Sequence, residues 1–395
     1  MRRSYLSQNE GLKAKEILVQ SKEESIKLEK AKLLPRVGVH LEYETLSSDI
    51  KDESEKFSSI YGELNLFNGF KDQASIERSR NSALIAKESL SFTKLRSLKR
   101  VEMLFYKFKY LDKKLRTLKK EQKRSLFHQR LVEKRLASGL VTETDLFEFK
   151  LYLNKLNTLI EYTELEQVNI YNQLFLLVGL DPGHKNEIVG DIPHLHIETK
   201  LSELLNSAQD SPAVRLSDLK VQDKRITTKY SKSNWLPRLD LKAEYGKLDD
   251  VETGISPEET SSQISLSVKW ELYSGGESVA DSKISRLNEL ASIHQKRNAQ
   301  TNYRIAIERN FNALMMLEKS IDQEERNLKL AKKLYRMTLK EYKKGVKDSG
   351  ALLSASKDIS ESEGRVFELK LNYVSKKLNL EELSGKVLSF KTISH

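Results

Sequence analysis

The stretch Leu66-Phe67-Asn68-Gly69 decides the fold, because it returns 206 residues later as Leu272-Tyr273-Ser274-Gly275. Both copies read apolar, aromatic, small polar and glycine in the same order. The same offset relates two further pairs of glycines, Gly139 with Gly345 and Gly179 with Gly385. A repeating unit of this size indicates the internal duplication of a domain-sized element, since solenoid repeats are only about 20–50 residues long.

Long helices are predicted wherever helix-breaking residues are missing. No proline lies between Pro35 and Pro182, and no glycine lies between Gly69 and Gly139. The matching stretch of the second copy is equally free of both residue types, so each copy can hold a helix of about 65 residues, or roughly 100 Å. We predict two helical hairpins, 70–179 with its tip at Gly139 and 275–384 with its tip at Gly345.

The apolar pattern in these stretches favours an antiparallel coiled coil. Apolar residues step by three or four residues, or recur every seven, which keeps them on one face of a helix. The stripes in the first copy are Val101, Phe105, Phe108, Leu111 and Leu115, then Leu146, Leu153 and Ile160, and those in the second are Ile307, Phe311, Leu314, Leu317 and Ile321, then Leu352, Ile359 and Val366.

Apolar and polar residues alternate with a period of two after Leu34-Pro35-Arg36 and after its counterpart, Leu236-Pro237-Arg238. Alternating apolar and polar residues predict one β-hairpin per copy, 36–68 and 238–273, with about ten residues per strand. Tilted strands of that length can cross a bilayer, and aromatic residues lie toward their ends. The residues predicted to face lipid are Val37, Val39, Leu41, Tyr43, Ile60, Leu64, Leu239, Leu241, Tyr245, Leu266, Val268 and Trp270.

Alternation by itself leaves two interpretations of these hairpins open. The sheet either packs as a soluble amphipathic layer on its own helices or faces a membrane. Four strands cannot close a barrel alone, because single-chain membrane barrels begin at about eight strands and open edges in lipid leave backbone groups unpaired. A membrane sheet would therefore have to be shared by several protomers.

Composition excludes several function classes. The 395 residues carry a formal charge of +11 and no cysteine, which rules out disulfides and a lipid anchor on an N-terminal cysteine. No glycine-rich phosphate loop or nucleophile elbow is present, so we predict neither an enzyme nor a cofactor. A metal site is the weaker interpretation of the few histidines between the two copies, and an ordinary linker is favoured: His184, Asp191, His194 and His196.

Basic residues gather on two long helical stretches, where a solvated helix face is the favoured interpretation. Docking of a partner protein is the second interpretation, and nucleic-acid binding is disfavoured because no known binding motif accompanies the charges. These residues are Lys113, Lys114, Arg116, Lys119, Lys120, Lys123 and Arg124, with Lys332, Lys333, Arg336 and Lys340.

The ordered succession of helix, Leu-Pro-Arg, strand, polar loop, strand, Leu-Phe-Asn-Gly, long helix, glycine turn and long helix, repeated in full, resembles the TolC-like outer-membrane efflux proteins. The resemblance covers nearly the entire chain. It implies a homotrimer in which each protomer gives four strands to a twelve-stranded barrel in outer-membrane lipid and its helices to a periplasmic tunnel. It also implies a passive exit duct of a tripartite efflux or type I secretion system, working with a periplasmic adaptor and an inner-membrane transporter.

The resemblance sets the expected boundaries. We expect a first repeat at 1–180, a linker at 181–200, a second repeat at 201–386 that opens with helices in 201–232, and a tail at 387–395. Members of the family begin with a signal peptide and one further helix, and the first residues here resemble the end of that helix. We therefore expect a truncated chain or a mis-set start codon.

The resemblance also implies functional residues at the hairpin tips. A gate is expected at Thr144, Asp145, Tyr342 and Lys347, where Asp145 has the capacity to accept hydrogen bonds from both Tyr342 and Lys347. The alternative is that these are solvated residues at helix ends. Adaptor contact is expected around the two turns, at Gly139, Leu140, Thr142, Gly345, Val346 and Asp348. Ala351 and Ser354 stand where members often carry acidic residues, so no acidic ring is expected there.

A second function class stays open at this point. The long helices alone would also permit a soluble, elongated coiled-coil scaffold or binding protein. The duplicated hairpins favour the duct, because a scaffold has no need of matched amphipathic strands in both halves. Nothing in the sequence specifies the cargo.

Overall fold

The computed structural model describes residues 9–47, 52–183, 187–193, 195–207, 211–250, 259–385, 388 and 390–392. The chain divides into two compact units. The first, which we call the tip unit, comprises Met1–Lys13, Ser91–Pro212 and Gln300–His395. The second, the sheet unit, comprises Ala14–Leu90 and Ala213–Ala299.

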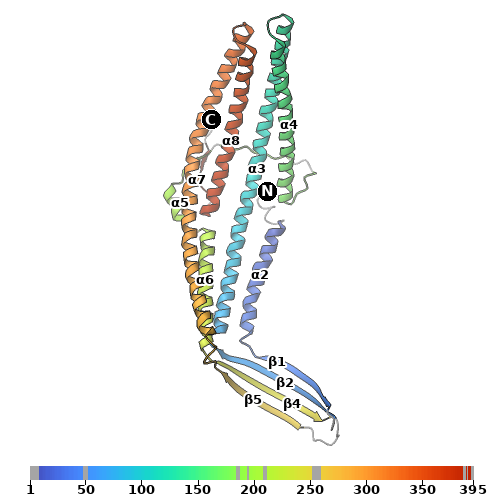
Figure 1. Ribbon diagram of the computed structural model, residues 1–395, viewed down its shortest axis with the longest axis vertical. Helices are drawn as coiled ribbons and strands as arrows, with labels where there is room; N and C mark the ends of the chain where they lie inside the picture. Colours follow the sequence, from blue (N-terminus) through green and yellow to red (C-terminus); the bar gives the residue numbers. More distant parts are fainter. Residues whose placement is uncertain are drawn as a thin grey trace. The chain divides into compact units, whose positions relative to one another are not determined.

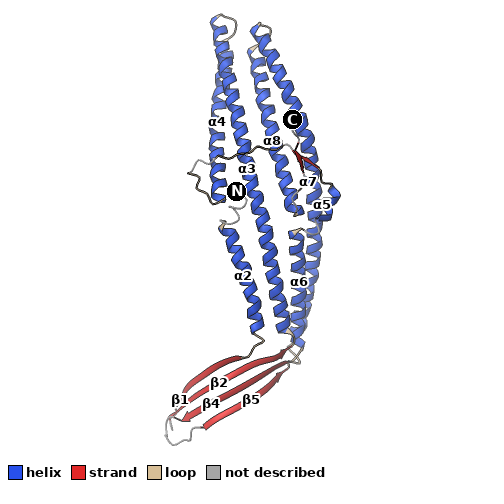
Figure 2. Cartoon of the chain, turned by 180° about the vertical axis from the view of Figure 1, so that it is seen from behind, coloured by secondary structure: helices blue, strands red, loops and turns tan. Residues whose placement is uncertain are grey.

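Two helical hairpins make up most of the tip unit, which confirms the predicted coiled-coil architecture. The first joins α3 (Lys71–Ala137) to α4 (Glu143–Leu177), and the second joins α7 (Glu277–Lys343) to α8 (Ser349–Ser384). In both views of the chain α3 and α8 lie between α4 and α7 (Figures 1 and 2). α4 and α7 are therefore the outer helices of these four, and the short helix α5 (Leu201–Ser207) lies beside α7 in both views.

The predicted apolar stripes form the core of the tip unit. Ile307, Leu314 and Ile321 of α7 are nearly inaccessible to solvent and join a cluster with Tyr373 and Leu380 of α8. Leu118 of α3 packs on Leu156 and Ile160 of α4 in the same manner. This unit also contains the short helix α5 (Leu201–Ser207) and a two-stranded sheet of β3 (Leu195–Ile197) and β6 (Phe390–Thr392).

Two shorter helices pair with α3 and α7 in the sheet unit. They are α2 (Glu10–Ala31) and α6 (Pro212–Lys232), the latter followed by one 3₁₀ turn, η2 (Ser233–Trp235). Lys229 of α6 lies 3.0 Å from the carboxylate of Glu77 of α3, and the Asn81 amide donates to the carbonyl of Leu219 at 2.9 Å. The helical region predicted for 201–232 is thus two helices, α5 and α6.

A four-stranded antiparallel sheet completes the sheet unit. It consists of β1 (Arg36–Ser47), β2 (Asp52–Asn68), β4 (Arg238–Asp250) and β5 (Glu259–Lys269), in the spatial order β1-β2-β4-β5. The hairpin of the first repeat therefore lies beside that of the second. The strands have 12, 17, 13 and 11 residues, more than the ten expected.

The predicted hairpin 238–273 extends four residues past the end of the sheet, and Trp270 is one of these four. Trp270 follows the end of β5 at Lys269, which pairs with Arg238, the first residue of β4. Beyond that pair β4 offers no partner, so the chain leaves the sheet toward two glycines with positive φ, Gly275 and Gly276. The indole of Trp270 donates instead to the carbonyl of Trp235 at 3.2 Å.

Candidate functional site

Both hairpin tips use the same glycine turn. Gly139 has φ +67° and Gly345 has φ +82°, in the left-handed region that favours glycine. The amide of Leu140 donates back to the Arg135 carbonyl and that of Val346 to the Glu341 carbonyl, each at 2.9 Å, which closes the ends of α3 and α7. Leu140 and Val346 themselves are 64% and 70% exposed, so each turn presents an apolar side chain to solvent.

Two of the tip residues expected to contact an adaptor are helix caps. The Thr142 hydroxyl accepts from the Asp145 amide at 3.4 Å, while the Asp145 carboxylate accepts from the Thr142 amide at 2.9 Å, a reciprocal capping box at the start of α4. At the equivalent place in the second copy, Asp348 accepts from the Ala351 amide at 2.7 Å. Both caps leave their own side chains at the surface.

The predicted gate residues do not all meet within one protomer. Asp145 is bonded to Thr142 rather than to Tyr342 or Lys347, and the Thr142 amide, above all, lowers the pKa of the Asp145 carboxyl. Tyr342 is fully buried, and its hydroxyl lies 3.4 Å from the Ser349 hydroxyl. Thr144 and Lys347 are exposed, and Lys347 forms no ion pair within the described residues.

Arg135, which the sequence analysis did not single out, joins the two hairpins. Its guanidinium donates to the carbonyl of Tyr342 and lies 4.6 Å from the centroid of that ring. Around this contact Val132 of α3 and Phe149 of α4 pack with Tyr342 and with Leu352 of α8, so the cluster draws on all four helices. The sequence pointed to Arg135 only as one of the basic residues that precede each glycine turn, and not as a contact between the hairpins.

A second contact of this kind lies two turns further from the tips. His128 of α3 is fully buried, and its Nε2 lies 2.9 Å from the Tyr335 hydroxyl of α7. Its Nδ1 has no hydrogen-bond partner among the described residues. Burial lowers the pKa of His128 to about 4, so the ring is neutral at pH 7 and Nε2 either accepts from or donates to Tyr335.

The sheet has one apolar and one polar face, as its alternation predicts. Cross-strand partners share a face, so Val39, Ile60 and Tyr245 line up on one side. Each of these three side chains is more than half exposed, at 66%, 56% and 62%. On the other face Asp240 accepts from Asn65, and Glu244 accepts from Ser59, both at 2.6 Å.

The rest of the apolar face is assembled from the other predicted residues. Leu64, Leu241 and Leu266 are cross-strand partners, and so are Leu239 and Val268, all on the side of Ile60. Val37, Leu41 and Tyr43 of β1 complete this face and are between 61% and 76% exposed. Among the described residues of the sheet unit, no helix packs closely on these side chains.

Metal sites and membrane-spanning helices each have requirements that the described residues do not meet. No group of three or more metal-binding side chains is placed to hold an ion in this part of the chain, while His184 and His194 lie outside it. His196 instead contacts Glu318 of α7. No helix in the described ranges is long and apolar enough to span a membrane.

Comparison with known proteins identifies the class. A sequence model of the outer membrane efflux protein family matches residues 2–180 and 204–386. The chain therefore belongs to the outer membrane efflux protein family, whose members are transport channels rather than enzymes. No curated protein sequence matches the chain.

Solved channels share the fold along almost the whole chain. The outer membrane protein VceC from Vibrio cholerae is 14% identical with a TM-score of 0.85, covering 98% of this chain and 95% of VceC. The Campylobacter jejuni channel CmeC is 14% identical with a TM-score of 0.84, covering 98% and 85%. The open-state Neisseria gonorrhoeae channel MtrE is 15% identical with a TM-score of 0.83, covering 98% and 88%. At such low identities, the TM-scores establish the shared fold alone. None of these three structures supports the interpretation as a soluble coiled-coil scaffold.

Proposed function

We propose that this chain forms a passive, homotrimeric exit duct in the bacterial outer membrane that extends into the periplasm. In this proposal it completes a tripartite efflux or type I secretion system with an adaptor and an inner-membrane transporter. The observation that carries the proposal is the four-stranded sheet, whose apolar face is exposed and whose outer strands, β1 and β5, pair with no further strand among the described residues.

A lipid environment accounts for that sheet better than water does. Soluble monomers rarely expose contiguous apolar patches larger than a few hundred Å². In lipid, the free backbone edges of β1 and β5 would need partners, because unpaired amides and carbonyls cost several kcal/mol each. Pairing β5 of one copy with β1 of the next satisfies both edges, and three copies give twelve strands.

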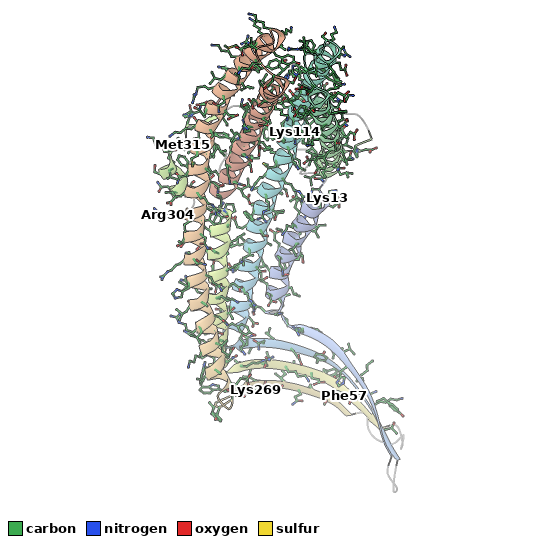
Figure 3. All side chains as sticks on the ribbon, turned by 45° about the horizontal axis from the view of Figure 1, so that its top comes forward. Lys13, Phe57, Lys114, Lys269, Arg304 and Met315 are labelled. Carbon is green, nitrogen blue, oxygen red and sulfur yellow. The ribbon has the colours of Figure 1, made fainter. Side chains whose placement is uncertain are left out.

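The outer helices of the tip unit support self-association. α4 leaves Phe147, Leu151, Tyr162 and Leu165 between 57% and 64% exposed. On α7, which carries Met315 and Arg304 (Figure 3), Met316, Leu330, Leu334 and Met337 are between 51% and 71% exposed. Both stripes keep nearly helical spacing, so each can serve as a coiled-coil seam.

The charges beside these two stripes are complementary. α4 carries six acidic and two basic residues between 143 and 177, whereas residues 329–347 carry eight basic residues and one acidic residue. Glu148 and Glu161 on α4, and Lys333 and Lys340 on α7, are exposed and form no ion pair within the described chain. We therefore place α4 of one protomer against α7 of its neighbour.

The tips are the proposed gate and adaptor contact. The four expected gate residues, Thr144, Asp145, Tyr342 and Lys347, lie within one turn or two of the glycine turns, and exposed Leu140 and Val346 offer apolar contacts. Lys347 is exposed, and in this proposal it pairs with an acidic group of a neighbouring protomer. With Ala351 and Ser354 on α8, we propose a tunnel entrance without an acidic ring.

The test is the oligomeric state of the full-length gene product. We expect the protein to need detergent for extraction and to have the mass of a trimer, and purified trimers to conduct ions across planar lipid bilayers. A monomer or dimer that stays in solution without detergent contradicts the proposal. Extraction as a trimer without conductance contradicts the duct while leaving the assembly in place.

A further inference from the structure

The interface between the two hairpins is unusually polar. Along α3, one line of positions is spaced at alternating steps of three and four residues, as in a coiled-coil seam, and Glu121, His128 and Arg135 of this line contact the second hairpin. These positions are Leu118, Glu121, Ser125, His128, Val132 and Arg135. The first five are at least nine-tenths buried, and three of those five are polar.

Glu121 makes the most specific contacts of this seam. It is fully buried, and its two carboxylate oxygens accept from the hydroxyls of Ser356 and Ser360 of α8 at 2.9 and 2.8 Å. Arg124 of the same helix donates to Glu121 through Nε at 2.9 Å and to the Ser360 hydroxyl at 2.7 Å. The carboxylate is therefore paired with a cation and bonded across the interface.

The directional contacts in this part of the seam are the hydrogen bonds that Glu121 and its partner Arg124 make with Ser356 and Ser360. Apolar contacts across the interface, such as those of Val132 with Tyr342 and Leu352, are non-directional, so they tolerate a displacement by one turn. Hydrogen bonds are directional and lose most of their strength when the atoms part by an ångström. A buried polar residue in a coiled-coil seam typically adds little stability relative to an apolar one but selects a single register.

We propose that Glu121 is a positioning residue that sets the register of the first hairpin against the second. Through that register it fixes which turn of α3 meets which turn of α7, and hence the pairing of His128 with Tyr335 and of Arg135 with Tyr342. These two pairs are each separated by 207 residues and follow one another at intervals of seven. A displaced register would break both together. A role of this register in opening the channel rests on the proposed function, whereas the role of Glu121 in setting the register does not.

The alignment can be measured from native side chains. Lys120, next to Glu121, lies 3.8 Å from the carboxylate of Glu363 on α8. Lys99 of α3 also contacts Glu382 near the far end of α8. A carbodiimide joins an amine to a carboxylate without a spacer, so mass spectrometry of crosslinked peptides reports which residues are in register. Crosslinks within one chain do not depend on whether the protein conducts.

The decisive variant is Glu121→Leu, with Glu121→Gln as the conservative variant and Glu133→Leu on the exposed side of α3 as the matched control. We expect Glu121→Leu to fold with an unchanged or higher unfolding temperature, to lose the Lys120–Glu363 crosslink at least threefold, and to gain links from Lys120 to Asp358 or Glu368. Glu121→Gln, whose amide oxygen accepts from one serine while its NH2 group donates to the hydroxyl of the other, keeps most of the native crosslink. Glu133→Leu leaves the pattern unchanged.

Two results would overturn the proposal. If Glu121→Leu keeps the native crosslink in full, the register is set elsewhere. If Glu121→Leu fails to fold or unfolds at a much lower temperature, Glu121 is needed for stability and is not a positioning residue. The proposed duct fails separately, through the oligomeric state and conductance of the unmodified protein.

Discussion

Arg135 holds Tyr342 at two points, because its guanidinium covers the tyrosine ring at 4.6 Å while donating to the carbonyl of the same residue. One side chain of the first hairpin thus fixes both the side chain and the backbone of the second, at the last turns before the tips. A guanidinium is suited to this double role because it is planar and carries several donors.

Replacing Arg135 should loosen the tips. We expect Arg135→Ala to weaken the contact between the hairpins by about 1–3 kcal/mol, because a buried carbonyl loses a charged donor. In bilayers the variant should conduct more than the unmodified channel. Arg135→Lys should lie between the two, since an ammonium cannot stack on the ring. The exposed Arg130→Ala is the control, and equal conductance of all variants would contradict the assignment of this contact to the gate.

His128 makes stability depend on pH. Its folded pKa of about 4 lies below the ordinary value of 6.5, so the unfolded chain binds a proton in that interval which the folded chain does not. The contribution of His128 to the free energy of unfolding is therefore fully present above pH 6.5. It decreases as the pH drops toward 4, by up to about 3 kcal/mol. We expect the unfolding free energy measured in urea to vary less with pH between these values in His128→Gln than in the unmodified protein. The exposed His294→Gln should keep the original pH dependence. A pH profile unaltered by His128→Gln would refute the prediction.

The capping box of α4 should contribute measurable local stability. Thr142→Ala removes both the hydroxyl acceptor and its bond to Asp145, and we expect a loss of about 1 kcal/mol. Thr142→Ser keeps the hydroxyl and should retain most of that contribution. Hydrogen exchange at the first amides of α4 is the measurement, and equal protection in the two variants would show that the cap is not needed.

The complementary charges of α4 and α7 predict a salt-sensitive assembly. The double variant Glu148→Lys and Glu161→Lys should lower the trimer fraction at low salt, since like charges would then meet at the proposed interface. Adding Lys333→Glu and Lys340→Glu should restore it. Mass determination at low and high salt tests this, and a trimer fraction that ignores both charge reversals would exclude this face from the interface.

The two faces of the sheet should respond differently to charge. Leu266→Arg puts a cation on the apolar face, where we expect a cost of about 2–4 kcal/mol in a bilayer. Gln263→Arg, three residues earlier in β5 and on the polar face, is the matched control and should be well tolerated. Comparing the detergent-extracted yield of folded protein gives the answer, and equal yields would argue against lipid on the apolar face.

Sequence patterns predicted the elements well, since each depends on local periodicity. The strand alternation from Val37 to Tyr43 and the heptad positions Leu153 and Ile160 needed no knowledge of partners. Trp270 was predicted within a strand but follows the end of β5, because that end depends on where β4 begins, which is a tertiary property.

The contacts between hairpins lay beyond sequence reasoning for the same reason. Glu121 and His128 are polar residues on a long helix, and their partners in the second hairpin lie more than 200 residues away in the sequence. The bond of Asp145 to Thr142, by contrast, is a local capping pattern that the sequence displays and that competes with the more distant partners first assigned to it.

The two halves of this duplicated chain have lost their interchangeability. The partners of His128 and Arg135 are tyrosines, yet the residues at the matching places in the first copy, 206 positions earlier, are Gln129 and Leu136. A chain made of two first halves would set Arg135 against leucine and leave the guanidinium without its ring. The ancestral repeat has thus become a pair of specialised halves, and neither could now be replaced by a second copy of the other.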